Sequence, residues 1–443
     1  MALSGLDIYK LLPKTNCRDC GFVTCLAFAM QLAKKSVSIN KCPYLKDDVK
    51  KALEASNQPP VKLVTLGEGD NKLELGNETV LFRHEEKFHH PCAIGFILGD
   101  GLKNDEIISK LDKINQLKFE RVGQKLDVNL IAVKQSGAAA RFVETVKLVA
   151  SKTGLNLILM SSDVVGLKAA AEALKPKKPL IYAATSENFT EIAKVSVEYG
   201  LPVVASAKDL EALSKLTQDL SSKGVNDLVI DTGEKTVKEK IWDLTQIRRQ
   251  ALKKANRSLG YPILAIVQDS DPCSEAMKAA TYISKYASIV LISGVEPEET
   301  LSLLTLRQNI YTDPQKPLQI ESKIYAIGAV TDKSPLMVTT NFSLSYYTVL
   351  GEVEACKIPC YIMSVNTEGM SVLTAWAAEK FTPEKIAESL NKFEAANLVR
   401  HKKLIIPGYV AVMSGDLQDQ SGWDIIVGPK EAAGLPSFLK NLS

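Results

Sequence analysis

The chain contains 443 residues, with 54 Lys or Arg and 51 Asp or Glu, so its net charge is only +3 and the two signs are interspersed. This length predicts two or three domains, and the balanced charge gives no indication of a nucleic-acid or membrane-surface partner. Hydrophobic residues make up 46% of the chain, but the apolar runs stay well below the ~18 residues that span a bilayer. The start, MALSGLDIYKLLPK, shows no secretory signal, and we expect a cytoplasmic protein.

The N-terminal region contains a cysteine motif followed by a helix. Half of the eight cysteines lie there, and they are Cys17, Cys20, Cys25 and Cys42. Apolar residues at helical spacing predict a helix from Gly21 to Lys35. Gln58-Pro59-Pro60 then predicts a linker, so that residues 1–58 form a small domain.

The spacing of these thiols, Cys-x₂-Cys-x₄-Cys-x₁₆-Cys-Pro, allows them to converge on one metal centre. Four cysteines can hold structural zinc or an iron–sulfur cluster, so the number of ligands does not distinguish the two. Zinc ribbons usually have two Cys-x₂-Cys pairs, whereas this run is asymmetric, and Arg18 and Lys41 would offset the negative charge of a thiolate-bound cluster. The pattern favours an iron–sulfur cluster over zinc, and favours unliganded core cysteines least.

The middle of the chain predicts a barrel preceded by a hairpin. Two short apolar runs after Val61, VKLVTLG and LELGNETVLF, the second with a turn at Gly76-Asn77, indicate the hairpin. Eight continuously apolar runs then alternate with helical stretches; they are AIGFIL, VNLIAV, LNLILM, PLIYAA, PVVAS, DLVI, PILAIV and SIVLIS. Because such runs are typical of parallel strands covered on both faces, residues 61–316 predict a (β/α)₈ TIM barrel. A doubly wound open sheet is the alternative.

Residues 317–443 predict a shorter α/β domain. Its apolar runs PLMVTT, PCYIMSV, KLIIPG and WDIIVG are separated by helical stretches. Four or five parallel strands would form an open, Rossmann-like sheet, and such sheets bind ligands beyond the carboxyl ends of their strands. The predicted fold class is therefore multi-domain α/β.

The cysteine motif, the barrel and three C-terminal segments together resemble the large (gamma) subunits of corrinoid iron–sulfur proteins of the acetyl-CoA (Wood–Ljungdahl) pathway. The segments are NFSLSYYTVLGEVEACKIPCYIMSVNTEGMSVLTAW, IIPGYVAVMSGDLQ and VGPKEAAGLPSFL. The resemblance implies one [4Fe-4S] cluster on the four motif cysteines, a TIM barrel, and a C-terminal domain that binds a corrinoid against a small partner subunit.

The function implied by this resemblance is that of a methyl carrier. The corrinoid cobalt would accept a methyl group from methyltetrahydrofolate, bound on a separate methyltransferase, and donate it to acetyl-CoA synthase. The cluster would return inactive Co(II) to Co(I), since iron–sulfur potentials reach low enough values. The chain would then act as a component of a methyltransferase system, with no catalytic side chain of its own.

Residues near the expected C-terminal strand ends are candidate corrinoid contacts, because glycines there permit close backbone approach and amides and hydroxyls can form hydrogen bonds. They are Thr339, Thr340, Tyr346, Gly369, Met370, Ser371, Val372, Leu373, Thr374, Gly408, Ala432, Ala433 and Gly434. Considered without the family, these residues are better explained as ordinary turn and cap residues.

The histidines indicate no protein ligand to cobalt. The Asp-x-His-x-x-Gly pattern of many corrinoid domains is absent from the sequence, and His401 lacks that context. We therefore expect a base-off corrinoid without a histidine ligand. His84, His89 and His90 lie among Glu and Lys residues, which favours a solvated loop.

Two other functions remain open at this point. The chain could be a ferredoxin-like electron carrier fused to a barrel enzyme without a corrinoid, or a scaffold with a zinc-stabilised N-terminus. A barrel enzyme should show convergent acids, bases or phosphate-binding glycines at its strand ends, and the sequence places mostly Ser, Thr and isolated Asp there.

Overall fold

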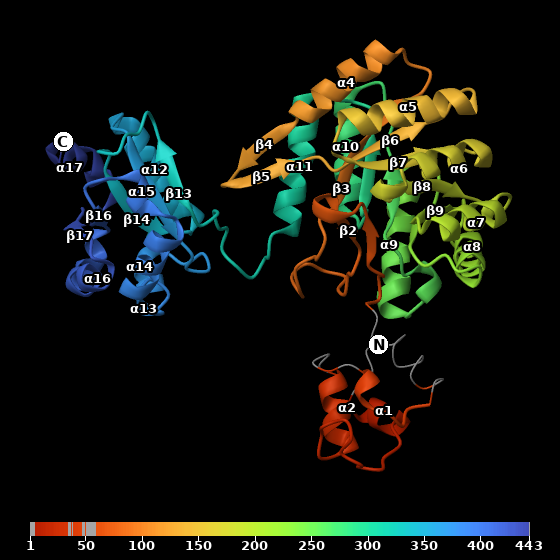
Figure 1. Ribbon diagram of the computed structural model, residues 1–443, viewed down its shortest axis with the longest axis horizontal. Helices are drawn as coiled ribbons and strands as arrows, with labels where there is room; N and C mark the ends of the chain where they lie inside the picture. Colours follow the sequence, from red (N-terminus) through yellow and green to blue (C-terminus); the bar gives the residue numbers. More distant parts are fainter. Residues whose placement is uncertain (1–4, 34–36, 38, 47–48, 50–58, 443) are drawn as a thin grey trace. The chain divides into compact units, whose positions relative to one another are not determined.

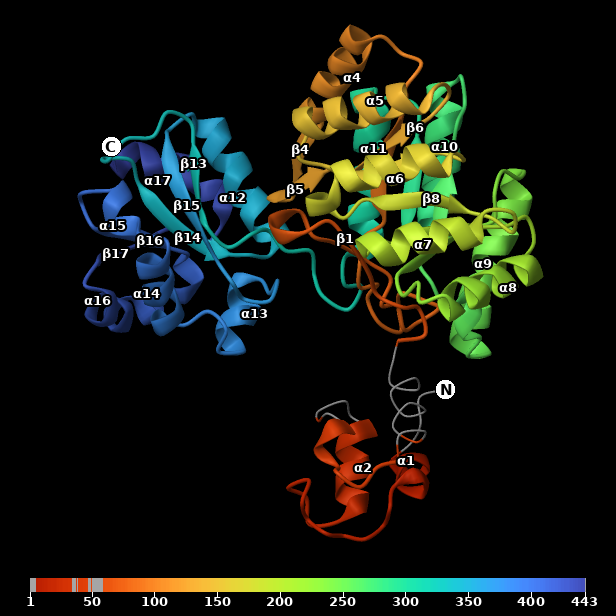
Figure 2. The ribbon, with the colours of Figure 1, turned by 45° about the vertical axis from the view of Figure 1, so that its right-hand side comes forward.

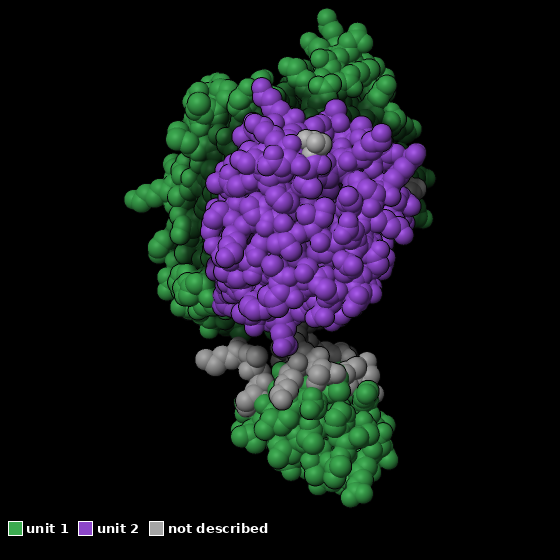
Figure 3. Space-filling view, turned by 90° about the vertical axis from the view of Figure 1, so that its left-hand side faces the viewer, with its two compact units in different colours: residues 1–118, 127–311 green, residues 119–126, 312–443 purple. Residues whose placement is uncertain are grey.

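The structure, a computed structural model, describes residues 5–33, 37, 39–46, 49 and 59–442. The chain divides into two compact units (Figure 1, Figure 3). The first comprises residues 1–118 and 127–311, and the second comprises residues 119–126 and 312–443. The expected barrel boundary at residue 316 lies near this division. The cysteine-containing segment is grouped with the first unit, so its status as a separate domain stays a prediction.

The N-terminal segment contains two short helices around a small apolar core. They are α1 (Gly5–Leu11) and α2 (Cys25–Ala33), followed by the 3₁₀ turn η1 (Ile39–Lys41). The expected helix begins at Cys25 because Gly21 has a φ of +85° and the Thr24 hydroxyl accepts a hydrogen bond from the Ala27 amide at 3.1 Å. Lys34 and Lys35, at its expected end, lie outside the described residues.

A two-stranded antiparallel hairpin precedes the barrel, as expected. It joins β1 (Val64–Leu66) to β2 (Leu73–Leu75) through the 3₁₀ turn η2 (Gly69–Asn71). The turn at Gly76 and Asn77 exists, with both φ angles positive, but it leads the chain out of β2. Val64, Leu66 and Leu75 are buried against the residues inside the barrel. The hairpin therefore helps to fill the barrel core.

The first unit contains an eight-stranded parallel sheet in the order β10-β9-β8-β7-β6-β3-β12-β11. A parallel bridge between Ile230 and Ile263 joins its edges, so the sheet closes and the predicted barrel is confirmed. All eight predicted strands form; they are β3 (Ala93–Gly99), β6 (Leu130–Lys134), β7 (Asn156–Met160), β8 (Leu180–Ala184), β9 (Val203–Ser206), β10 (Leu228–Asp231), β11 (Leu264–Ile266) and β12 (Ile289–Ile292).

A helix follows each barrel strand, and the helices cover the outside of the sheet (Figure 2). They are α4 (Asn104–Gln116), α5 (Ala139–Lys152), α6 (Val164–Ala173), α7 (Phe189–Tyr199), α8 (Leu210–Ser222), α9 (Val237–Lys253), α10 (Pro272–Ser284) and α11 (Pro297–Tyr311), with 3₁₀ turns η3 (Lys175–Lys177) and η4 (Arg257–Leu259). Several begin at a side-chain cap; Thr236 and Glu239, for example, form a reciprocal capping box on α9.

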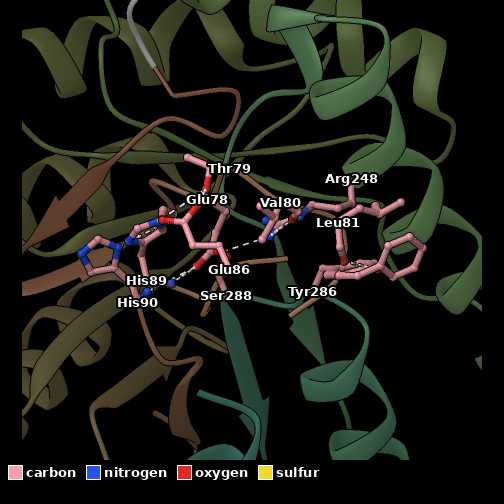
Figure 4. A network of polar contacts seen from close by, with 12 residues as sticks. Glu78, Thr79, Val80, Leu81, Glu86, His89, His90, Arg248, Tyr286 and Ser288 are labelled. Carbon is pink, nitrogen blue, oxygen red and sulfur yellow. Dashed lines mark hydrogen bonds and ion pairs between the residues drawn. The ribbon is translucent and has the colours of Figure 1, made fainter. Parts of the chain in front are cut away.

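A buried ion pair fixes the segment between the hairpin and the barrel (Figure 4). The Glu78 carboxylate accepts hydrogen bonds from the Arg248 guanidinium at 3.0 Å and from the backbone amides of His89 and His90 at 2.9 and 3.3 Å. The expected solvated loop is found at residues 84–87, which are exposed, whereas His89 and His90 are half-buried. Because a charge left alone in such a place is strongly destabilising, this pair binds the segment to α9.

A second hairpin was not predicted from the sequence. It consists of β4 (Lys118–Arg121) and β5 (Gln124–Asp127), between α4 and β6, and most of it belongs to the second unit. Val122 packs against the apolar cluster that contains Ile320. This hairpin makes the second unit discontinuous in sequence.

The second unit contains a five-stranded sheet in the order β13-β15-β14-β16-β17. Its strands are β13 (Ile324–Ile327), β14 (Leu336–Thr340), β15 (Cys360–Val365), β16 (Lys403–Ile406) and β17 (Asp424–Val427). The last four pair in parallel as predicted, whereas β13 is an antiparallel edge strand. The open-sheet domain is thus confirmed.

Helices cover both faces of this sheet. They are α12 (Ser343–Cys356), α13 (Val372–Ala377), α14 (Pro383–Lys392), α15 (Ala395–Leu398), α16 (Ser414–Ser421) and α17 (Leu435–Leu442), with 3₁₀ segments η5 (Gly408–Met413) and η6 (Ala432–Gly434). One apolar cluster contains side chains of α12 and α17 together with Met337 of β14. The other contains side chains of the four helices α13, α14, α15 and α16 together with Leu336 and Val338 of β14. The side chains of adjacent β14 residues thus point to opposite faces of the sheet.

Within the described part of the chain, no helix combines the length and the apolar character needed to cross a membrane.

Candidate functional site

A cavity of about 300 Å³ opens at the carboxyl edge of the sheet in the second unit. It is lined from β14 by Thr339, from the segment after β15 by Ser371, and from the segments after β16 and β17 by Pro407 and Ala432. Parallel pairing brings these strand ends to one edge, which is where open α/β sheets bind ligands. The cavity therefore lies where the sequence predicted a binding site.

Four of the thirteen candidate contacts line this cavity, and they are Thr339, Ser371, Val372 and Ala432. Gly408 lies in a loop that requires glycine, because a Cβ there would come within 2.5 Å of the Gly428 carbonyl oxygen. A Cβ added at Gly434 would likewise come within 2.9 Å of the Pro429 Cβ atom. These two glycines support the backbone around the cavity.

Three candidates at the same edge are exposed beside the cavity, and they are Leu373, Thr374 and Ala433. The Thr374 hydroxyl lies 2.9 Å from the Ser371 hydroxyl at the start of α13. Met370 is half-buried and packs against the apolar cluster beneath the loop. Met370, Leu373, Thr374 and Ala433 are therefore all within three residues, in sequence, of a residue that lines the cavity.

The remaining three candidates do not line the cavity. Tyr346 is buried between the sheet and α12, where its ring centroid lies 4.8 Å from that of Tyr325. Thr340 is fully buried, and its hydroxyl has no partner among the described residues. Gly369 is buried as well, with φ +76°, and a Cβ there would lie 2.8 Å from Gln319 Cγ.

Asn341 is a positioning residue that the sequence analysis missed. It directly follows β14 and is only 3% exposed. Its carbonyl Oδ1 accepts hydrogen bonds from the Thr367 amide (2.9 Å), the Thr367 hydroxyl (3.1 Å) and the Gly369 amide (3.0 Å). Its Nδ2 donates to Gln319 Oε1 at 3.0 Å. One side chain thus fixes the loop that leads to Ser371, and its position at a parallel strand end is the signal that could have identified it.

Two of the residues that line the cavity have large exposed side chains. Leu344 is 65% exposed and Tyr409 is 42% exposed. The Tyr409 hydroxyl donates a hydrogen bond to the Glu431 carboxylate, which raises the pKa of Tyr409. An exposed apolar surface around a cavity is typical of a ligand or protein interface.

His401 lies at the opposite, amino edge of the same sheet. Its Nδ1 accepts a hydrogen bond from the Lys403 amide at 2.9 Å, and its Nε2 donates to the Ser334 carbonyl oxygen at 3.1 Å. Both ring nitrogens are therefore engaged, in the neutral Nε2-H tautomer. His401 lines a different cavity, of about 420 Å³, at that edge.

The four motif cysteines lie near one another in the N-terminal segment. All eight cysteines of the chain are free thiols. Burial raises the pKa of Cys42, and the charges of Cys20, Cys17 and Cys25 raise it further. The Cys25 sulfur also accepts a hydrogen bond from the Asn16 amide at 3.4 Å. Among the described residues, no three metal-binding side chains stand at ligand distances from one another.

The backbone before and between these cysteines suits an electron-rich sulfur centre. The φ angles of Lys14, Asn16 and Arg18 are positive, at 60°, 49° and 71°, while those of the intervening residues are not. Within this stretch the Asn16 amide donates a hydrogen bond to the Cys25 sulfur, an interaction that favours an electron-rich thiolate there. In ligand type, number and local backbone, the segment fits a four-thiolate cluster.

The charged groups at the carboxyl ends of the barrel strands pair with one another. Asp231 binds Lys240 at 2.7 Å and accepts a hydrogen bond from the Tyr182 hydroxyl at 2.9 Å. Glu299 approaches Glu275, and burial together with the Glu275 charge raises the pKa of Glu299 to about 7. The sequence did not reveal these partners, because they come from separate strands and helices of the chain.

The fold defines a (β/α)₈ barrel protein that carries an open-sheet domain and a four-cysteine segment. Residues 63–439 match the family model described as "CO dehydrogenase/acetyl-CoA synthase delta subunit", and residues 12–44 match one described as "Putative Fe-S cluster". The chain is 45% identical to the corrinoid/iron-sulfur protein large subunit of Moorella thermoacetica over 99% of each chain.

A second relative extends the comparison to archaea. The gamma subunit of the acetyl-CoA decarbonylase/synthase complex of Methanothermobacter thermautotrophicus is 37% identical over 100% of each chain. The chain therefore belongs to the family of corrinoid/iron-sulfur protein large subunits and their gamma-subunit relatives, which confirms the resemblance. Among solved structures, a dihydropteroate synthase from Thermus thermophilus aligns with 56% of this chain and 100% of its own, at TM-score 0.39 and 14% identity.

Replacing Asn341 by alanine should loosen the loop that it holds. The change removes the acceptor of the Thr367 and Gly369 amides, and each lost hydrogen bond costs about 1 kcal/mol. We expect these two amides to exchange with deuterium about tenfold faster or more. Asn397→Ala, on the exposed surface of α15, is the matched control and should leave them unchanged. Unchanged exchange in Asn341→Ala would contradict the assigned role.

Proposed function

We propose that this chain is the corrinoid-binding and cluster-binding subunit of a methyl-transfer system. When bound, the corrinoid supplies a cobalt ion that accepts a methyl group from methyltetrahydrofolate on a separate methyltransferase and gives it to acetyl-CoA synthase, and the cluster supplies electrons that restore oxidised cobalt. The observation that carries this proposal is the cavity at the carboxyl edge, in a chain that is 45% identical to a corrinoid/iron-sulfur protein large subunit along its whole length.

The chain's own residues would hold the corrinoid from one side. Thr339, Ser371, Val372 and Ala432 would contact it directly, because they line the cavity. The exposed Leu373, Thr374 and Ala433 would extend this contact, whereas Gly369, Gly408, Gly434 and Asn341 would hold the loops. Thr340 and Tyr346 are not proposed as contacts, because both are buried in the domain core.

A partner subunit would complete the site. The cavity is small for a corrin ring, and the large exposed side chains of Leu344 and Tyr409 lie among the residues that line it. A flat macrocycle would therefore cover this surface and present its other face to a second protein. We propose the small corrinoid protein subunit as that partner in a heterodimer, with the methyltransferase and acetyl-CoA synthase as transient partners.

We propose that Cys17, Cys20, Cys25 and Cys42 hold one [4Fe-4S] cluster. The free thiols, their mutual charge effect on Cys42 and the hydrogen bond from the Asn16 amide to the Cys25 sulfur support this ligand set. The role of these residues is to bind the cluster close to the protein surface. Methyl transfer itself is a two-electron step on the corrinoid and requires nothing from these thiols.

Loss of the cluster should abolish reactivation and preserve methyl acceptance. Wild-type protein purified without oxygen should contain about four iron and four sulfide per chain, and Cys20→Ala should lose most of both. Loaded with reduced corrinoid, Cys20→Ala should accept its first methyl group at a near-normal rate but fail to recover after oxidation. Cys273→Ala, an exposed cysteine outside the motif, should retain both properties. Zinc in place of iron, or loss of the first turnover, would contradict the proposal.

Filling the cavity should prevent corrinoid binding. Ala432→Leu adds side-chain volume at a lining position and leaves the backbone free of strain, so we expect at least a tenfold loss of affinity, equivalent to about 1.4 kcal/mol. Ala396→Leu makes the same change at an exposed position of α15 and should bind normally. Equilibrium dialysis with a visible spectrum measures both. Normal binding by Ala432→Leu would place the corrinoid elsewhere.

We further propose that the corrinoid is bound base-off, without a histidine ligand. His401 supports this, because both of its nitrogens are hydrogen-bonded at the amino edge, away from the strand ends that line the cavity. Electron paramagnetic resonance of the Co(II) protein should therefore show no nitrogen splitting from an axial ligand, and His401→Ala should give the same spectrum. Nitrogen splitting in the wild type would refute this part of the proposal.

A further inference from the structure

A second cavity lies at the amino edge of the open sheet in the second unit, and we call it the amino-edge cavity. Its volume is about 420 Å³, which is within the usual range of small-molecule sites. Its lining includes Lys333, Leu336, Arg400 and Ile426. Among the described residues, only Ile405 lines both this cavity and the one at the carboxyl edge. The two cavities are therefore separate sites on the same sheet.

Hydrogen bonds hold together the two loops that form the wall of the amino-edge cavity, one before β14 and one before β16. The Arg400 amide donates to the Asp332 carbonyl oxygen at 3.0 Å. His401 then donates from Nε2 to the Ser334 carbonyl oxygen at 3.1 Å and accepts from the Lys403 amide at 2.9 Å. Because these bonds fix the wall in the absence of a ligand, little ordering would be required on binding.

Apolar side chains make up much of the rest of the lining. Leu336 and Ile405 are 1% and 4% exposed, so they present only a small part of their surface to solvent. Ile426 of β17 and Leu442, at the end of α17, extend this apolar surface. Binding sites for organic ligands usually combine such a surface with a few polar groups that fix the orientation of the ligand.

The charged residues of the lining are mostly basic. Lys333, Arg400 and Lys403 are exposed cations, and Asp332 is the one acid among the described lining residues, so the cavity has a surplus of two positive charges. Of the ion pairs that the described residues form, none involves Lys333 or Lys403. Both ammonium groups are thus available to an anion.

Arg400 can also take part in binding an anion. Its Nε lies 2.6 Å from the Asp332 carboxylate, but its side chain is 88% exposed, and an ion pair at such a position contributes little to stability. The planar guanidinium matches the geometry of a phosphate group. Basic residues can also offset the negative carboxyl ends of helices. That role would explain the charge alone, and it gives no reason for an apolar cavity beside it.

We propose that the amino-edge cavity binds a small organic phosphate of nucleotide size. The phosphate group would contact Lys333, Arg400 and Lys403, and the ring of the ligand would pack on Leu336 and Ile405. A phosphate monoester has a charge of about −1.5 to −2 at pH 7, which matches the surplus of two positive charges. This site is independent of the proposed corrinoid and cluster sites, and binding requires no chemical step.

Calorimetric titration of the full-length protein tests the proposal. The probes are adenosine monophosphate, adenosine and inorganic phosphate, which separate the contribution of the ring from that of the phosphate. Lys333→Gln/Lys403→Gln removes two of the cations. Lys147→Gln/Lys152→Gln changes the net charge equally at exposed positions of α5, and Lys333→Arg/Lys403→Arg preserves the charge of the cavity. The Tm of each protein is measured with and without adenosine monophosphate, because a ligand that binds the folded state raises it.

We expect the wild type to bind adenosine monophosphate with a Kd below about 1 mM, and to bind adenosine and inorganic phosphate at least about tenfold more weakly. Lys333→Gln/Lys403→Gln should lose at least about tenfold in affinity, together with the rise in Tm caused by the ligand. The arginine variant and the α5 variant should remain within about threefold of the wild type. Binding to the wild type should weaken at about 0.5 M salt, where charges are screened.

Four outcomes would overturn the proposal. Wild-type protein that does not bind adenosine monophosphate below about 1 mM would exclude the ligand class. Unchanged affinity in Lys333→Gln/Lys403→Gln would place the nucleotide elsewhere, and a lower ligand-free Tm in that variant with unchanged affinity would assign these lysines to helix ends. An equal loss in the α5 variant would indicate a general charge effect. Binding of inorganic phosphate as tight as that of the nucleotide would show that the apolar lining takes no part.

Discussion

Parallel strand pairing is the constraint on which the two larger sheets of this protein depend. A parallel strand needs a long crossover, and here helices supply the crossovers and cover the strands, so the strands are apolar along their length. Polar and small residues are thereby confined to the strand ends. In the second unit this brings Thr339, Ser371 and Ala432, which are far apart in sequence, to one cavity. The location of the site is a consequence of topology.

Buried loop amides at a strand edge need hydrogen-bond acceptors, because no neighbouring strand supplies them. In the second unit the Asn341 side chain supplies one, since its Oδ1 accepts hydrogen bonds from Thr367 and Gly369. In the first unit, the Glu78 carboxylate is a comparable acceptor, since it accepts hydrogen bonds from the His89 and His90 amides and from Arg248. In both places one buried side chain accepts the hydrogen bonds that a strand or helix would otherwise accept, and its loss would leave several donors without partners.

The N-terminal segment must be stabilised differently, because it is too small to have a large hydrophobic core. Its apolar cluster contains Ile8, Phe28 and Leu32 together with Cys25. Segments of this size usually need a metal or a disulfide for stability, and all of its cysteines are free. Cluster binding and stability would then depend on the same four thiols, and the exposed Cys17 would keep the centre near the surface.

The sequence alone determined the repeating elements and the cysteine motif, because continuous apolar runs and ligand spacing are local properties. All eight barrel strands and the four parallel strands of the second unit formed where these runs predicted them. Tertiary structure alone decided that Thr339 lines the cavity, whereas Thr340 is fully buried and its hydroxyl has no hydrogen-bond partner among the described residues. It also decided that Tyr346 is buried, that Glu275 meets Glu299, and that β4 and β5 join the second unit. These features depend on pairs of segments far apart in sequence, and their packing follows from the assembled fold.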